Sequence, residues 1–137
     1  LEPTSGAGFT RDIWYQKKTP MTEAAIKNGV YLKHLSRKET LAVMAGLVVD
    51  HLIDQKRYKE AIAVSDVLLE AYPQHAYLLA KKGTSYYHLL KAEIIDQYPK
   101  IHEIPAQIRK RANQLYRQNQ PAFRQAEALG WRQTQLQ

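Results

Sequence analysis

Five histidines are the residues of this chain best suited to bind a metal or to transfer protons. They are His34, His51, His75, His88 and His102. None of them lies in an H-E-x-x-H pattern or in a Cys/His zinc pattern. Asp50 and Asp54 lie four residues apart, on one face of a helix, with His51 beside them. Two carboxylates and an imidazole can bind a cation, but no fourth ligand is evident. A solvated helix face is the favoured interpretation, so no metal site and no cofactor are predicted.

The residues needed for nucleophilic catalysis are also missing from the sequence. The chain has no cysteine, which excludes a disulfide framework, a thiolate zinc site and a cysteine nucleophile. The serines stand in no nucleophile elbow; they are Ser5, Ser36, Ser65 and Ser85. The glycines at residues 6 and 8 lack the strand–helix context of a phosphate-binding loop. We therefore expect that the isolated chain is not an enzyme.

Positive charge is concentrated toward the C-terminus. The chain carries 20 Lys+Arg against 13 Asp+Glu, a formal net charge of +7. Residues 105–137 contain six basic side chains and one glutamate. Five of these basic side chains form a candidate basic stripe: Arg109, Lys110, Arg111, Arg117 and Arg124. Such a stripe is typical of a nucleic-acid-binding surface or of a solvated helix face, and the second interpretation is favoured.

The spacing of apolar residues predicts helices and no strands. Ser36 and Glu39 form a capping box that starts a helix, and apolar residues surround so much of the following segment that burial on most sides is expected. Pro73 ends the next helix, and a helical pattern continues across Pro121. The expected helices are a short or broken one within 22–34 and longer ones over 36–54, 58–72, 76–92 and 105–129.

The predicted fold class is therefore all-α, a stack of antiparallel helical hairpins with five or six helices and an irregular N-terminal arm. Residues 1–20 form the arm, which could be the tail of a preceding domain; residues 21–132 form the helical domain, and residues 133–137 are frayed. The longest apolar run, residues 41–49, is far shorter than the roughly 20 residues of a membrane helix. No membrane association and a cytoplasmic location are expected.

Two of these helices match the register of a 34-residue helical repeat. Tyr58, Ala61, Leu68 and Pro73 stand where the second helix of such a repeat carries its aromatic, small, packing and terminating residues, and Gly83 and Tyr86 continue the register into a second copy. This pattern resembles the tetratricopeptide repeat. Residues 93–104 would be an insertion that displaces the last helix, and the helices at 22–34 and 105–129 would cap the stack. An ordinary helical bundle is the alternative.

The first six residues, LEPTSG, resemble the end of the catalytic core of bacterial transglutaminase-like proteins of the papain fold. Some of these proteins continue into a tetratricopeptide-like C-terminal part, so the resemblance implies that this chain is the module after such a core. Glu2 stands where the family usually has Asp, and the catalytic Cys is absent. A remnant role of Glu2 beside a core supplied elsewhere is a third, less favoured hypothesis, and an unremarkable turn is the alternative for the motif.

The repeat register places a group of aromatic and charged residues along one groove. They are Asp50, Ile53, Asp54, Tyr77, Lys81, Thr84, Tyr87 and His88. An aromatic groove of mixed charge suits an extended or helical peptide. The function that we predict is a non-catalytic protein–protein interaction module whose partner is a protein or peptide, which could be a domain of the same parent chain. A nucleic-acid-binding domain that uses the basic stripe is the alternative. The sequence does not indicate an oligomeric state.

Overall fold

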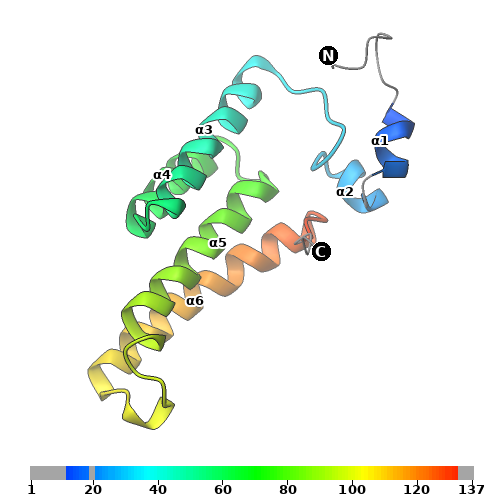
Figure 1. Ribbon diagram of the computed structural model, residues 1–137. Helices are drawn as coiled ribbons and strands as arrows, with labels where there is room; N and C mark the ends of the chain where they lie inside the picture. Colours follow the sequence, from blue (N-terminus) through cyan, green and yellow to red (C-terminus); the bar gives the residue numbers. More distant parts are fainter. Residues whose placement is uncertain (1–11, 19–20, 133–137) are drawn as a thin grey trace.

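The computed structural model describes residues 12–18 and 21–132, and within them the chain is helical without any strand. Four long helices form the body of the molecule: α3 (Arg37–Asp54), α4 (Tyr58–Ala71), α5 (Ala76–Leu90) and α6 (Ala106–Ala128). Figure 1 shows them as a stack in which α5 lies between the α3–α4 hairpin and α6. The predicted all-α stack of antiparallel helices is confirmed. Residues 1–6, with Glu2, and residues 133–137 lie outside the described residues.

The start of α3 is fixed by the predicted capping box. The hydroxyl of Ser36 accepts a hydrogen bond from the Glu39 amide (3.3 Å), and a Glu39 carboxylate oxygen accepts one from the Ser36 amide (2.8 Å). Lys33 Nζ lies 2.5 Å from the other carboxylate oxygen. The hydrogen bond from Lys33, followed by those from Ser36, lowers the pKa of Glu39 to about 2. The carboxylate therefore stays ionised at the positive end of the helix dipole.

The α3–α4 hairpin packs on α5 around a small apolar core. Its buried members are Val49, Leu52, Ala61 and Leu78. Ala61 is fully buried, as is Val49 on the facing helix. A small side chain here lets two helix backbones approach closely, which agrees with the small-residue position predicted at Ala61.

The connection from α5 to α6 begins as a π turn, η1 (Lys91–Ile95), and passes through a single 3-10 turn, η2 (Ile101–Glu103). The Asp96 amide donates to the Lys91 carbonyl (3.0 Å), five residues back. Ile94 is buried against Leu89 and Leu115, so apolar packing holds the wider turn in place. Residues 93–104 were expected as an insertion, and they form this connection.

Helix α6 runs antiparallel to α5 and passes without interruption through Pro121. Two residues after the proline, the Phe123 ring lies against Gly83 of α5. A Cβ added to Gly83 would meet three atoms of that ring at 3.0–3.1 Å. One turn earlier, the buried Asn119 side chain donates to the Gly83 carbonyl (2.8 Å). The helical pattern that the sequence shows across Pro121 therefore belongs to one helix and not to two helices that meet there.

The N-terminal segment differs from expectation. Residues 12–18, expected to be irregular, form helix α1 (Asp12–Lys18). Its Asp12 at the start and its Lys17 and Lys18 at the end complement the helix dipole. Helix α2 is only Glu23–Lys27. It does not cap α3, because the fully buried Ala25 lies against Gly130 after the end of α6 instead.

The second correction concerns α3, which was expected to be buried on most sides. Helices α4 and α5 cover one side of α3. Helix α2 lies beside the C-terminal end of α6 and not on α3 (Figure 1). The other side of α3 is therefore exposed, although it is apolar.

Candidate partner-binding surface

Three of the predicted groove residues form one cluster that bridges α3 and α5. Gly46 lies beside the Tyr77 ring, and a Cβ at that position would make an ordinary contact of 3.6 Å with it. One turn later, Asp50 accepts a hydrogen bond from the Tyr77 hydroxyl. The other oxygen of Asp50 lies 2.5 Å from Lys81 Nζ, and that ammonium is 5.1 Å from the centroid of the Tyr77 ring.

The charges in this cluster satisfy one another. Burial, followed by the hydrogen bond to Asp50, raises the pKa of Tyr77. Burial alone would lower the pKa of Lys81, but its hydrogen bond and attraction to Asp50, with a smaller effect of Tyr77, raise it overall. At neutral pH the Lys81 ammonium and the neutral Tyr77 phenol therefore both contact Asp50. It fixes the Tyr77 ring in place and leaves the groove without a free charge at this point.

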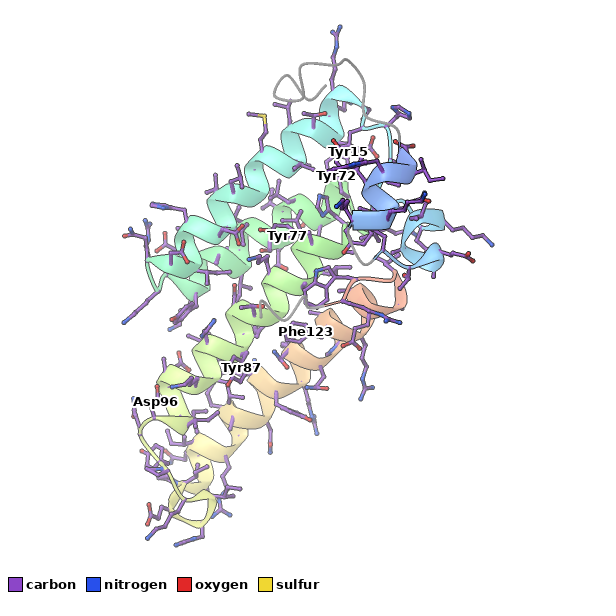
Figure 2. The ribbon with its side chains drawn as sticks, turned by 45° about the vertical axis from the view of Figure 1, so that its right-hand side comes forward. Tyr15, Tyr72, Tyr77, Tyr87, Asp96 and Phe123 are labelled. Atoms are coloured by element: carbon purple, nitrogen blue, oxygen red, sulfur yellow. The ribbon has the colours of Figure 1, made fainter. Side chains whose placement is uncertain are left out.

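The remaining predicted groove residues lie in different environments. Ile53 packs against the α3–α4–α5 core, and the His88 ring stacks on Tyr58 of α4 with centroids 5.2 Å apart. Thr84 is half-buried and donates to the Ala80 carbonyl (3.0 Å). Asp54 is exposed, and Tyr87 is an exposed ring further along α5 (Figure 2). Direct contacts therefore join Asp50, Tyr77 and Lys81, whereas Ile53, Thr84 and His88 contact other residues.

The most unusual surface was not predicted as a site. Five apolar side chains of α3 are between 44% and 64% exposed: Leu41, Val43, Met44, Leu47 and Val48. Val43 lies on the same side as Gly46 and Asp50, three and seven residues further on, and so borders Tyr77. We call these five residues together with Tyr77 the α3 surface. Their spacing along α3 was visible in the sequence, but it was interpreted there as burial.

The basic stripe on α6 is partly occupied by contacts within the protein. Arg109 donates to the Ile104 carbonyl (2.8 Å), and Arg111 is paired with Glu93 (3.2 Å). Lys110 and Arg117 border a shallow depression of about 450 Å³ among polar side chains, and Arg124 is exposed. These contacts interrupt the stripe as a continuous track for phosphates.

A larger depression, of about 640 Å³, lies between the start of α4 and the π turn, and sequence reasoning did not find it. Its wall includes the stacked Tyr58 and His88 rings. The charged side chains around it pair with one another, as in Lys59 with Glu93 (3.4 Å) and Lys91 with Asp96 (2.6 Å). Most of these charges are therefore compensated, Lys56 being the exception, and we assign no ligand to this depression.

Comparison with protein-family models, with curated proteins and with solved structures finds no match to this chain. Within residues 12–18 and 21–132, no group of three or more His, Asp or Glu side chains is arranged to hold a metal ion. Over the same residues, no helix has the length and apolarity that crossing a bilayer requires.

Proposed function

We propose that this chain is a non-catalytic protein-interaction module that binds its partner through the α3 surface. The observation that carries the proposal is the exposure of five apolar side chains on a single 18-residue helix. Monomeric proteins rarely expose large contiguous apolar patches, and such patches mark interaction sites when polar residues surround them. Covering these side chains would remove apolar area from water, which contributes about 25 cal/mol per Å².

The Tyr77 cluster supports the same surface. Aromatic side chains are enriched where proteins bind one another, because they bury a large area with few rotatable bonds. Tyr77 is held by Asp50 and lies under Lys81, so little side-chain freedom remains to be lost on binding. The α3 surface also contains the flexible Met44, so it combines a rigid ring with an adaptable side chain.

We further propose a tetratricopeptide-like stacking for α3, α4 and α5. Its support is the burial of Val49 and Ala61 in one cluster and the close approach of Phe123 to Gly83. In that arrangement the partner could be another domain of the same parent chain. The suggestion that the parent is transglutaminase-like rests on residues 1–6 alone.

A selection from a peptide display library tests the interaction function. The protein should enrich peptides whose binding falls at least about tenfold in Leu47→Gln, as expected when a large apolar contact is lost. The matched control is Val67→Gln on α4, because Val67 is 66% exposed and Leu47 64%. Peptides that bind both variants as well as the unaltered protein, or the enrichment of none, would overturn the proposal.

Nucleic-acid binding through the basic stripe remains the second hypothesis from the sequence, and the contacts of Arg109 and Arg111 weigh against it. With a net charge of +7 we expect weak association with DNA or RNA that disappears as salt rises, because neutralised phosphates release counterions. Titration with duplex and single-stranded DNA and with structured RNA at about 0.15 M salt would reveal a selective complex. Loss of such a complex in the Arg109/Arg117/Arg124→Ala variant would reverse the ranking of the two functions.

A further inference from the structure

The outward side of α3 carries the spacing of a coiled-coil seam. Leu41, Met44, Val48 and His51 follow one another at intervals of three, four and three residues, the alternation that places side chains along one stripe facing a partner helix. The first three are more than half exposed. The seam lies at the edge of the stack, where no described element covers it (Figure 1).

A helix is the occupant that fits such a seam best. The backbone amides and carbonyls of α3 are bonded within the helix, so α3 offers no hydrogen bonds to the backbone of an extended peptide. A partner pressed against the seam has to satisfy its own backbone groups, because leaving them buried and unpaired is costly. An α-helix does this and presents apolar side chains at the matching interval. At 18 residues, α3 is roughly 27 Å long, which suits a partner of similar length.

Charge decides what kind of helix fits. At the start of α3, Arg37 and Lys38 are exposed, and Lys56 follows its end; none of the three forms an ion pair within the described part of the chain. On the acidic side, Asp54 is exposed.

The other two carboxylates of α3 near this face, those of Glu39 and Asp50, are already paired with lysines. Uncompensated charge around the seam is therefore positive, and the whole chain carries +7. A second copy would bring like charge to the same place, whereas an acidic partner would be attracted to it.

We propose that the seam of α3 binds an acidic amphipathic α-helix, with the apolar side of that helix on Leu41, Met44 and Val48 and its carboxylates near Arg37, Lys38 and Lys56. This assignment rests on the proposed interaction function and names the chemistry of the partner. The apolar seam supplies the affinity, and the basic side chains at both ends select acidic helices and speed their association.

Two designed peptides test the assignment on the full chain. Both are about three heptads long with Leu at positions a and d; one has Glu at every e and g position, and the other has Lys there. Like charges along each peptide keep it from pairing with itself. Binding is measured by fluorescence anisotropy at low salt and at about 0.15 M salt. Protein self-association is followed by sedimentation.

We expect the Glu peptide to bind roughly tenfold more tightly than the Lys peptide at low salt, as a few exposed ion pairs would give, and the difference to shrink as salt rises. The double variant Val48→Gln/Met44→Gln should bind the Glu peptide at least about tenfold more weakly. Val67→Gln, which changes an exposed valine of α4 and is the matched control, should bind the Glu peptide as the unaltered protein does. Arg37→Glu with Lys38→Glu should reduce the preference for the Glu peptide, and Lys110→Glu on α6 should leave it unchanged.

Other outcomes separate this inference from the proposed function. Equal binding of both peptides, lost in the Val48→Gln and Met44→Gln variant, would overturn the acidic partner and leave the interaction function standing. If the chain self-associates and Met44→Gln abolishes this, the acidic partner is wrong and the seam binds a second copy of the chain. Binding of neither peptide, together with no enrichment from the display library, would overturn both proposals.

Discussion

Three glycines with different surroundings allow a direct test of how closely the helices pack. Gly46 lies within α3, where a Cβ would make ordinary contacts of 3.6 Å with Leu78 and Tyr77. Gly83 lies within α5, where a Cβ would meet the Phe123 ring at 3.0–3.1 Å. Gly130 follows α6 with a φ of +97°, and a Cβ there would lie 2.7 Å from backbone atoms of Ala25. Replacement of each by alanine should therefore have a different result.

The expected magnitudes follow from two opposing effects. Alanine in place of glycine inside a helix stabilises it by roughly 0.5–1 kcal/mol. At Gly46 nothing opposes this gain, so Gly46→Ala should be stabilising by that amount. At Gly83 the methyl group overpacks the Phe123 contact, which costs roughly 1–3 kcal/mol. The net effect of Gly83→Ala is then a destabilisation of about 1 kcal/mol, since overpacking exceeds the helix gain.

Gly130→Ala should be the most damaging of the three. A left-handed backbone conformation costs a residue with a Cβ roughly 1–2 kcal/mol, and the contact with Ala25 involves backbone atoms that cannot rotate away. The expected response is separation of α2 from the end of α6, with loss of the hydrogen bond from the Asn28 side chain to the Leu129 carbonyl (3.2 Å).

Urea and thermal denaturation followed by circular dichroism measure these changes, and 1 kcal/mol corresponds to a shift in melting temperature of roughly 3–5 °C for a chain of this size. Phe123→Leu should rescue Gly83→Ala in a double-mutant cycle, because the smaller side chain removes the contact that the methyl group disturbs. Phe123→Leu should not change the effect of Gly46→Ala on stability, because Gly46 does not lie against Phe123. A stabilising Gly83→Ala together with a destabilising Gly46→Ala would refute the packing described here.

Three further predictions concern single sites. Ser36→Ala removes the hydroxyl that caps α3 and should lower the free energy of unfolding in urea by about 1 kcal/mol, most of which Ser36→Asp should retain. Ala61→Leu should overpack the core and destabilise by roughly 1–3 kcal/mol, whereas Lys59→Ala, at an exposed position, should change stability by less than about 0.5 kcal/mol; equal melting temperatures would contradict this. The neutral His75 ring caps α5 by accepting from the Leu78 amide (3.4 Å), and burial lowers its pKa below the ordinary 6.5. As the pH falls, the unfolded chain takes up this proton first, so the contribution of His75 is present above about pH 6.5 and is lost at lower pH. His75→Asn, which caps without titrating there, should flatten the melting temperature between about pH 5 and about pH 7, and an unchanged slope would count against the cap.

The four long helices could be predicted because residues close to their ends determine where they start and stop. The capping box at Ser36 and the stop at Pro73 both act within a few residues, and both are observed. The π turn at Lys91–Ile95 has no such signal. Its wider ring depends on Ile94 reaching a core formed with Leu115, which lies on another helix.

The candidate site could be predicted only in part, for a related reason. A repeat register indicates which residues of α3 and α5 share a side, and it placed Asp50, Tyr77 and Lys81 together although they are distant in sequence. Apolar periodicity does not indicate whether a side is covered. Leu41 and Met44 look like core residues in the sequence, and they are exposed because α2 packs at the other end of the molecule.

The contact between Ala25 and Gly130 also determines where the chain enters and leaves the stack. Helix α2 and the end of α6 lie at the same corner of the molecule (Figure 1), where Ala25 contacts Gly130. A surface loop of a host protein could therefore accept the whole stack as an insertion without its two sides being forced apart. For the same reason a circular permutant, with a short linker joining this corner and new termini opened near Tyr98, should retain the helices and the exposed side of α3 in their present places.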